Sequence, residues 1–481
     1  MASLAVQQKR IGLAYWMQRV LLHVEKVAEG FGPDPVHDLR TALRRCRSLA
    51  DGLMVFDSDP AWKKMKRAGK QLFQSLGDLR DTHVLRDWVE RLAPEGDATA
   101  RVLKDFLGVR EQELQSLAAA ALTEFDRSKW NNWSHELPSR AARIPLDSPV
   151  FTHLALERWQ QARALHRRAL RNRTKVAFHD LRIGIKRFRY TVENFLPSLH
   201  QLWCEDLKET QDALGDVHDL DVLWQTARTI KAFPDSASQM CWRARVESER
   251  QKCLDKYGEK MVGSGSLWKV WRAALPEAEQ LRLIALQRLE IWASFLDPNV
   301  RHSRHVAELA LQLFDGLPDG TPDGKRETCR YILRAAAMMH DVGYAKASRG
   351  HHKASARLIR RLNPPLGWTA DEIRTASLIA RYHRGALPSE SQKSFAALPL
   401  SKRSLVQFLG GILRFACACD QQQDSQIRRV EVESFTPVLR VRAEGYSEAT
   451  ALAEHLASAR YLLELASHQP VFILPTESHA A

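Results

Sequence analysis

Two related stretches decide the fold of this chain: HDLRTALRRCRS at residues 37–48 and HDLRIGIKRFRY at residues 179–190. Each is followed by a second related stretch, LGDLRDTHVLRDW from Leu76 and LGDVHDLDVLWQT from Leu214. Because the motifs keep their order and approximate spacing in both halves, they indicate a duplicated unit. We expect the two repeats at about 8–140 and 150–260.

Both HDLR stretches are typical of amphipathic helices with one apolar and one cationic face. In the first copy, Leu39, Leu43 and Cys46 recur at helical spacing and form the apolar face, and the second copy repeats this pattern. A separate stripe carries the cations, with Arg45 and Arg187 at its flanks. Its members are His37, Arg40, Arg44 and Arg47 in the first copy and His179, Arg182, Lys186 and Arg189 in the second.

The cationic stripes favour a polyanion as ligand. A solvated helix face normally mixes charge signs, because like charges one turn apart repel each other. Here cations are stacked without acidic neighbours in both copies, and the net charge of the chain is +14. A solvated face remains the alternative. The stretch WKKMKRAGK adds a further set by its charge spacing: Lys63, Lys66, Arg67 and Lys70.

The side chains around these cations favour phosphate over nucleic-acid bases. Nucleic-acid readers usually place aromatic platforms or base-reading Asn and Gln among their cations, and these stripes contain almost none. Arginine forks and lysine ammonium groups bind phosphate oxygens directly. Nucleic acid is therefore the weaker alternative.

The paired HDLR-x3-[RK]-R-x-R helices with downstream LGD-x-x-D segments resemble the CHAD domain, the conserved-histidine α-helical domain, over about residues 8–260. The resemblance implies two pseudo-symmetric helical bundles. It also implies inorganic polyphosphate as the ligand, including polyphosphate granules, bound by the ten stripe and flanking residues named above. The acids of the LGD segments are expected to orient the cations: Asp78, Asp81, Asp216, Asp219 and Asp221.

The second half of the chain predicts a separate, mostly helical domain. MVGSGSLW at 261–268 is a linker signal, and we expect a linker and connecting helix at 261–284. Near the end, residues 428–435 and 437–445 alternate like strands, 447–466 reads as one helix, and PVFIL reads as a last strand. The predicted fold class is therefore mainly α: two helical bundles, then a helical domain with a small αβ appendage.

Histidines in this half occur in contexts that suit a divalent metal. They lie in RHSRHVAELALQLF, AAAMMHDVGY, RGHHKASARLI and ARYHRG, where imidazoles are combined with one adjacent carboxylate. Imidazole and carboxylate together are ligands for divalent transition metals, and a His-Asp step can be shared by two ions. Each histidine taken singly is more often a core or surface residue, so the prediction depends on their order.

That order resembles the HD superfamily of metal-dependent phosphohydrolases, and more closely the C-terminal HD-like domain of the exopolyphosphatase/guanosine pentaphosphate phosphatase family, over about 285–478. The resemblance implies a divalent metal (Mn, Mg, Fe or Zn) as cofactor, with His302, His340 and Asp341 as core ligands. It further implies His351 and His383 as ligands of a second ion, leaves His352 open, and gives Lys353, Arg381 and Arg384 as groups that meet phosphate.

Two features depart from that family pattern. The expected R-L-A-D-A-L-D context reads RFACACD at 414–420, so Cys417 stands where a carboxylate ligand is expected. Asp420 is the nearby carboxylate that can compensate, and we include it among the metal candidates. In addition, no glycine-rich phosphate loop such as G-x-x-x-x-G-K-[ST] is present, so the chemistry of the family's ATPase-like domain is not transferred.

The sequence therefore predicts a polyphosphate-binding protein whose HD-like module acts in polyphosphate handling or regulation. The alternative is a metal-dependent phosphohydrolase acting on polyphosphate or a phosphorylated nucleotide, and whether the chain is an enzyme stays open because of Cys417. No apolar run is long enough to span a bilayer, and the N-terminal residues do not have the pattern of a secretory signal. With seven scattered cysteines and no C-x-x-C, we expect reduced thiols and a cytoplasmic protein that can associate with polyphosphate granules.

Overall fold

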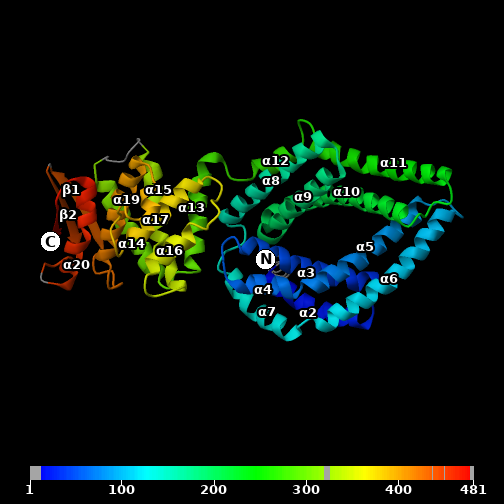
Figure 1. Cartoon of the computed structure of the whole chain (residues 1–481), viewed down its shortest axis with the longest axis horizontal. Coiled ribbons are helices and arrows are strands. Elements are labelled where there is room, and N and C mark those ends of the chain that lie inside the picture. Colours follow the sequence, from blue (N-terminus) through cyan, green and yellow to red (C-terminus); the bar gives the residue numbers. More distant parts are fainter. Residues whose placement is uncertain (1–11, 319–324, 436, 449, 477–481) are drawn as a thin grey trace. The chain divides into compact units, whose positions relative to one another are not determined.

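The structure is a computed structural model that describes residues 12–318, 325–435, 437–448 and 450–476. The expected domain start at residue 8 and the expected domain end at 478 lie outside the described residues. The chain divides into two compact units, Met1–Glu277 and Ala278–Ala481. Helices dominate both units (Figure 1), and the described residues contain a single three-stranded sheet near the C-terminal end. The predicted fold class is confirmed.

The first unit contains the two repeats as matching series of helices. Pro33 occupies the first turn of the first HDLR helix, and the Thr174 hydroxyl accepts a hydrogen bond from the backbone N–H of Ala177 to cap the second. The first repeat has α2 Leu13–Glu29, α3 Pro33–Leu53, α4 Pro60–Ala68, α5 Lys70–Leu92, α6 Ala98–Glu124 and α7 Arg127–Ala141. The second has α8 Pro149–Asn172, α9 Lys175–Phe195, α10 Pro197–Thr229, α11 Ser236–Met261 and α12 Leu267–Ala273.

The repeats contact each other through their HDLR helices, α3 and α9. Gly52 of α3 lies so close to the ring of Phe195 that a side chain there would overlap it. Next to this contact, the Arg45 guanidinium pairs with Glu193 and donates to the side-chain oxygen of Asn194 at 3.2 Å. Both acceptors are buried, so the two repeats are joined by apolar packing together with a buried, hydrogen-bonded ion pair.

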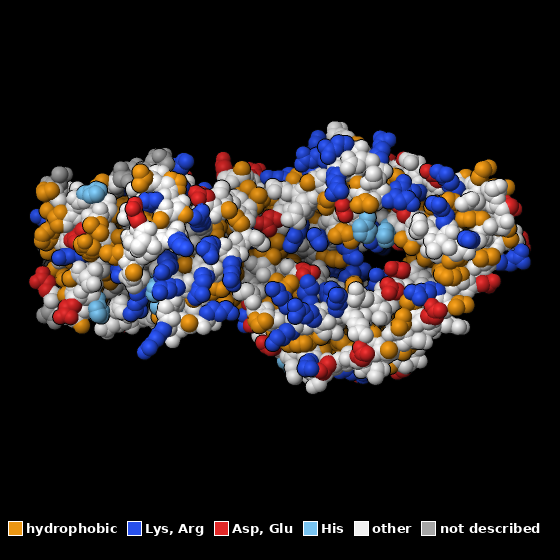
Figure 2. All heavy atoms as spheres, in the orientation of Figure 1, with side chains coloured by type: hydrophobic (Ala, Val, Ile, Leu, Met, Phe, Trp, Pro, Cys, Tyr) orange, Lys and Arg blue, Asp and Glu red, His pale blue; other side chains and the backbone are white. Residues whose placement is uncertain are grey.

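The far ends of the long helix pairs also meet. Leu85, Trp88 and Leu103 of the first repeat share one apolar cluster with residues of α10 and α11, including Trp242. The indole N–H of Trp242 donates to the carboxylate of Asp97, the residue that caps α6. Contacts at both ends leave a hollow between the repeats, and Figure 2 shows lysine and arginine side chains on both sides of it.

One ion pair between the long helices has opposite polarity in the two repeats, although Glu90 of α5 and Lys104 of α6 also pair at 3.6 Å in the first. In the first repeat, Arg86 and His83 of α5 contact the Glu111 carboxylate of α6. In the second repeat the acid is on the other helix: Asp221 of α10 accepts from Arg250 of α11 at 3.2 Å. Both repeats therefore have an ion pair at this position, but the acid is on the second long helix in the first repeat and on the first long helix in the second repeat.

Part of the segment expected to be a linker packs in the first unit. Residues 261–284 include α12, whose Trp268 and Trp271 are completely buried. Their rings lie 5.6 Å apart in an edge-to-face arrangement, and Trp271 also lies against Phe188 of α9. Composition alone indicated a linker because the glycines and serines before α12 are loop-forming residues, whereas the two indoles fill space beside α8 and α9.

The second unit is a helical bundle with a small sheet. Its sheet order is β1-β2-β3, with Val432 opposite Val441 in the antiparallel pair and Val441 opposite Ile473 in the parallel pair. The segment 447–466, expected to form one helix, forms two helices separated at Arg460. The elements are α13 Ala278–Ser294, α14 Val300–Gly316, α15 Arg326–Met339, η2 Val342–Ala345, α16 His351–Ile359, α17 Ala370–Tyr382, α18 Lys393–Ala396, α19 Leu400–Cys419, β1 Arg429–Phe435, β2 Val438–Glu444, α20 Ala451–Ala459, α21 Tyr461–Ser467 and β3 Val471–Pro475.

Helix α19 is the centre of this bundle. It contacts α14, α15 and α17 on one side and the appendage helices α20 and α21 on another. Gly411 permits the approach of α21, because a Cβ there would lie 2.9 Å from the Cα of Leu463. The C-terminal end of α19, which carries RFACACD, is therefore fixed between the helical bundle and the appendage.

Candidate functional sites

Cations from both repeats line one pocket where α3 and α9 meet, which we call the inter-repeat pocket. Its volume is about 550 Å³. Arg44 and Arg47 come from α3, and Lys186 and Arg187 come from α9. Its full lining is Arg44, Arg47, Ser48, Asp51, Gly52, Lys66, Phe73, Arg158, Ile183, Lys186, Arg187, Tyr190 and Thr191. The pocket thus combines residues that are far apart in sequence but equivalent in the two repeats.

One cation of the inter-repeat pocket is neutralised by the single carboxylate in its lining. Lys66 pairs with Asp51, and Arg47 donates from Nη1 to the backbone carbonyl of Lys66 at 2.8 Å. Among the residues that the structure describes, Arg44, Lys186 and Arg187 have no ion-pair partner. These three groups are available to an anion.

The aromatic faces at this pocket are covered by cations. Arg44 lies over the ring of Tyr190, 5.4 Å from the ring centroid, and the Lys186 ammonium lies over the same ring at 5.9 Å. Arg47 lies over the ring of Phe73 at 5.1 Å. Both rings therefore stabilise and orient pocket cations through cation–π contact.

The crowding of positive charge is strongest at Lys186. Burial, followed by the charges of Arg182, Arg44 and Arg40, lowers the pKa of its ammonium group to about 8. Burial is also the main cause of the lowered pKa of Arg40, although the charge of Asp81 opposes it. A charged Lys186 is therefore costly in the free protein, and a bound anion would relieve that cost.

The LGD segments bring acidic side chains close to the stripe cations. The Asp81 carboxylate lies 3.6 Å from Arg40 and thus orients one stripe cation. Burial raises the pKa of Asp219 to about 6, against the opposing charge of Arg182. Asp221 pairs instead with Lys175 at 2.9 Å and with the α11 arginine, so it does not face the stripe.

The predicted basic residues occupy different positions. Five of the fourteen line the inter-repeat pocket: Arg44, Arg47, Lys66, Lys186 and Arg187. Arg40 lies outside the lining and, like Arg182, acts on Lys186 through its charge. His37, His179 and Arg182 lie outside the lining, and the ring of His179 is 5.0 Å from that of His218. Arg45 and Arg189 both face the buried carboxylate of Glu193.

The set predicted from charge spacing does not form one continuous stripe. Helix α4 ends at Ala68 and α5 begins at Lys70, so Gly69 separates Lys70 from the others. Lys63, Arg67 and Lys70 are exposed. Conversely, Arg158 of α8 lines the pocket but was not among the predicted residues; its position in the basic run 151–190 was the available signal.

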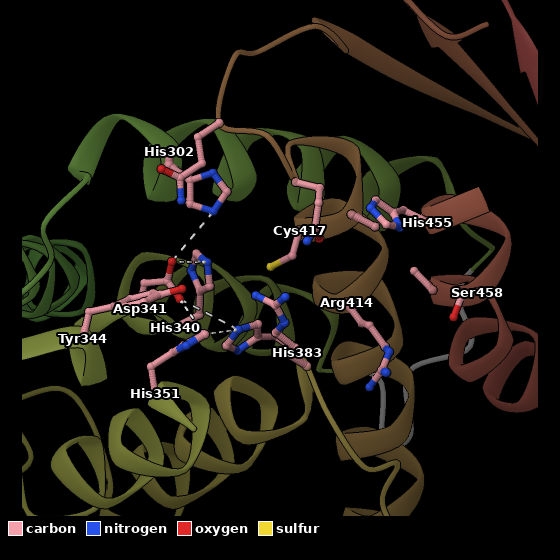
Figure 3. Close-up of a pocket in the computed structure, with 15 residues that line it drawn as sticks. His302, His340, Asp341, Tyr344, His351, His383, Arg414, Cys417, His455 and Ser458 are labelled. Atoms are coloured by element: carbon pink, nitrogen blue, oxygen red, sulfur yellow. Dashed lines mark hydrogen bonds and ion pairs between the residues drawn. The ribbon is translucent and has the colours of Figure 1, made fainter. Parts of the chain in front are cut away.

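In the second unit, four histidines and an aspartate converge at one end of the bundle (Figure 3). His302 is near the start of α14, His340 and Asp341 follow α15, His351 begins α16, and His383 follows α17. All five are buried. One Asp341 carboxylate oxygen lies 3.4 Å from His340 Nε2 and 3.9 Å from His302 Nε2, while the other lies 3.3 Å from His351 Nε2 and 3.8 Å from His383 Nε2.

The outer ring nitrogens fix the tautomers of these histidines. The Nδ1 atoms of His340 and His383 lie 2.6 and 2.7 Å from the carbonyl oxygens of Ala337 and Ala380, and Nδ1 of His351 lies 3.2 Å from another carbonyl. Because a carbonyl oxygen only accepts, each Nδ1 must donate, and each neutral ring presents a lone pair at Nε2. Burial lowers the pKa values of His340 and His383, which favours the neutral rings.

The centre of the cluster therefore contains acceptors facing acceptors. The Nε2 atoms of His351 and His383 are 3.3 Å apart, and one carboxylate oxygen of the buried Asp341 has no hydrogen-bond donor among the described residues. A cation between them would satisfy all of these groups. Two sets of ligand atoms are close enough to hold an ion each: His302, His340 and Asp341, and Asp341, His351 and His383. The residues thus fit one or two divalent metal ions of the types that imidazole and carboxylate bind.

Asp420 does not occupy the metal-ligand position that the sequence predicted for it. Its carboxylate accepts a hydrogen bond from Nδ1 of His302 at 2.7 Å and another from the backbone N–H of Ser425 at 2.8 Å. It therefore lies behind His302, where it fixes the tautomer that presents Nε2 to the centre. These hydrogen bonds lower the pKa of Asp420, although burial opposes them.

The cluster opens into a pocket of about 180 Å³. Arg384, Cys417 and, from the appendage helix α20, His455 and Ser458 line it together with the metal candidates. Arg384 has no ion-pair partner among the described residues, whereas Arg414 donates to the carbonyl oxygen of Gly385 at 2.9 Å. Sequence reasoning had no signal for the contribution of α20, because α20 reaches the pocket through its tertiary packing against α19.

The remaining candidates lie at the edge of this pocket or away from it. His352 is not in the lining, and its Nε2 faces Gly385. Lys353 and Arg381 are also outside the lining. His305 contacts the backbone carbonyl of Ile427 through Nε2 at 2.8 Å and so anchors the segment before β1.

The fold and the two sites define a two-domain helical protein, with a basic pocket in a duplicated bundle and a buried cluster suited to divalent metal in a second bundle. The family model for the CHAD domain matches residues 13–228, and the model for the Ppx/GppA phosphatase, domain III, matches residues 290–455. The chain thus contains a CHAD domain followed by a domain III of the Ppx/GppA phosphatase type, which confirms the resemblance. No curated protein matches the chain. Among the described residues, no helix has the length and apolar character needed to cross a membrane.

Proposed function

We propose that this protein binds inorganic polyphosphate in the inter-repeat pocket. The observation that carries the proposal is the convergence of Arg44, Lys186 and Arg187 from two repeats without acidic partners in the described chain. A flexible chain of phosphates can contact all of these cations at once, and the release of counterions would drive binding.

Two observations favour a phosphate chain over nucleic acid. The rings of Phe73 and Tyr190 are already covered by arginine and lysine groups, so they are not free to stack on bases. The pocket lining contains no Asn or Gln that could read base edges. Recognition would therefore depend on phosphate oxygens alone.

The double charge reversal Arg40→Glu/Arg182→Glu tests this proposal. Both residues act electrostatically on Lys186, so the reversal should abolish binding of long-chain polyphosphate in a calorimetric titration. The matched control is Arg110→Glu/Lys252→Glu, which changes the net charge equally at exposed positions of α6 and α11. Circular dichroism checks the fold of both variants. Unchanged affinity in the first variant, or equal loss in both, would refute the proposal.

Competition and localisation extend the test. Polyphosphate should displace labelled DNA at matched salt and phosphate concentration far more readily than DNA displaces polyphosphate. In cells that form polyphosphate granules, we expect a fluorescent fusion to collect on the granules and the Arg40→Glu/Arg182→Glu fusion to stay diffuse. Preference for DNA in the competition would favour nucleic acid as the ligand.

A second candidate function, metal-dependent phosphohydrolysis, is supported by the acceptor atoms that converge around Asp341. Divalent ions held by the two ligand sets would polarise a phosphoryl oxygen and lower the pKa of a bound water. Arg384, exposed at the pocket and without an acidic partner among the described residues, would bind the phosphate of the substrate. Polyphosphate and phosphorylated nucleotides are the substrate candidates.

Metal analysis and turnover test this second function. Purified protein should retain a divalent metal and release phosphate from polyphosphate, and His340→Ala/Asp341→Ala should lose both properties. His305→Ala is the control, because this histidine contacts a backbone carbonyl outside the cluster. Protein that retains metal without turnover would leave the domain as a binding or regulatory module.

A further inference from the structure

The thiol of Cys417 points toward the histidine cluster. Figure 3 shows its sulfur directed into the pocket, on the side that faces His302 and His340. Cys417 lines this pocket together with all five ligand candidates. Its sulfur lies outside the two close ligand sets, so it is a neighbour of the cluster and not a member of either set.

The cluster is short of negative charge. Asp341 is the one carboxylate in either ligand set, and it is shared by both. Asp420 cannot take a ligand position without losing its hydrogen bonds to His302 and Ser425. Among the described residues that line the pocket, Cys417 and Tyr344 are therefore the remaining side chains that can become anionic ligands. The ring of Tyr344 stacks on that of His351, which belongs to the second ligand set.

We propose that Cys417 binds, as a thiolate, the metal ion held by His302, His340 and Asp341, and thereby selects zinc or another thiophilic ion over Mn²⁺ and Mg²⁺. This inference rests on the metal centre proposed above. On binding, the S–H bond breaks, the proton passes to solvent and a metal–sulfur bond forms. Soft thiolate ligands favour zinc-type ions, whereas Mn²⁺ and Mg²⁺ prefer oxygen ligands.

With this ligand, the two metal ions would have different numbers of protein ligands. With Cys417, the first ion has four protein ligands, the usual complement of a structural zinc site. The second ligand set, Asp341, His351 and His383, has three, which leaves a position for water or a phosphate oxygen. Arg384, which directly follows His383 in the chain, lines the same pocket. The cysteine would thus keep the first ion bound, and water or a phosphate oxygen of the substrate would bind at the second ion.

Cys419 provides a matched control within the same helix. It is buried, with 1% of its surface exposed, and it packs in the apolar core of the bundle. Unlike Cys417, it does not line the pocket. Two residues of separation on an α-helix turn the side chains about 200° apart. Cys419→Ser therefore reports the effect of losing a buried thiol in α19 without loss of the proposed ligand.

X-ray absorption at the zinc edge tests the inference on the full-length protein loaded with zinc. A sulfur neighbour should appear at about 2.3 Å, in addition to nitrogen and oxygen neighbours at about 2.0–2.2 Å. It should disappear in Cys417→Ser and remain in Cys419→Ser. In the cobalt-loaded protein, the thiolate-to-metal absorption in the near ultraviolet should follow the same pattern.

Metal competition gives a second measurement. The ratio of zinc to manganese affinity should fall at least tenfold in Cys417→Asp, which exchanges the thiol for an oxygen ligand, and stay unchanged in Cys419→Ser. Wild-type protein that binds zinc without a sulfur neighbour would overturn the role of Cys417 and leave the metal centre intact. Wild-type protein that binds no metal would overturn both the role of Cys417 and the metal centre. Both results are measured on the wild-type protein, so neither depends on whether a variant folds.

Discussion

The salt dependence of polyphosphate binding offers a quantitative test of the inter-repeat pocket. Replacing Arg44 and Lys186 with glutamine removes one cation from each repeat without adding charge. Neither has an ion-pair partner among the described residues, so each should neutralise a phosphate directly. For a single-stranded polyanion, each neutralised phosphate contributes about 0.7 to the slope of log K against log salt. The double variant should therefore have a slope smaller by about 1.4.

That difference is large enough to measure by fluorescence anisotropy with labelled polyphosphate. Raising the salt concentration about fourfold should weaken wild-type binding roughly sevenfold more than it weakens binding by the variant. Arg110→Gln/Lys252→Gln, which neutralises exposed cations of α6 and α11, should keep the wild-type slope. If the pocket variant also kept that slope while binding more weakly, these two cations would not contact phosphate and the reasoning would be wrong.

Three further outcomes are expected. Binding should weaken as the pH rises above about 8, with log K falling by up to one per pH unit, because Lys186 has a pKa of about 8 in the free protein and bound phosphate would keep it protonated. Gly411→Ala should lower the thermal stability of the second unit by about 1–3 kcal/mol through overlap with α21, whereas Gly410→Ala, whose new Cβ would meet its nearest neighbour at 3.7 Å, should be neutral or stabilising in the same melting experiment. Asp420→Asn should reduce metal affinity about 10- to 100-fold in a chelator competition, because the carboxylate that orients the Nδ1–H of His302 is removed.

Each of these outcomes has a matched comparison. Lys186→Arg should bind with little pH dependence above 8, and a dependence equal to that of the wild type would exclude Lys186 as the titrating group. Equal melting temperatures for the two glycine variants would contradict the close approach of α21. Asp424→Asn, which removes a carboxylate four residues beyond the proposed orienting group, should leave metal affinity unchanged, and an equal loss in both variants would point to a general charge effect.

The duplicated bundle could be predicted because its signals are local and repeated. The HDLR motifs have helical periodicity, and their recurrence indicated two equivalent helices before any contact was known. The sequence did not reveal which stripe cations remain free, since this depends on partners distant in the chain. Arg45 is occupied by Glu193, nearly 150 residues away, whereas the adjacent Arg44 is not. Spacing along one helix contains no information about the helix that packs against it.

The residues of the metal cluster could be predicted to a similar extent. The histidines and Asp341 lie at helix ends that a bundle brings together, and their order in the chain, through its resemblance to the HD superfamily, selected them. The role of Asp420 was not predictable, because a shift from ligand to orienting group depends on the direction of a side chain at the end of α19. The contribution of α20 to the pocket could not be predicted either, since it depends on the tertiary packing of α20 against α19.

The exchange of acid and base between the two repeats has a consequence for how the chain avoids misassembly. Duplicated segments can dock on the wrong copy, within one chain or between neighbouring chains, and so give domain-swapped products. If α6 docked on α10, Glu111 would meet Asp221; if α11 docked on α5, Arg250 would meet His83, with Arg86 one turn away. Both wrong pairings would oppose like charges, which disfavours them relative to the native partners. This inverted ion pair thus favours docking of each long helix within its own repeat over docking on the other copy.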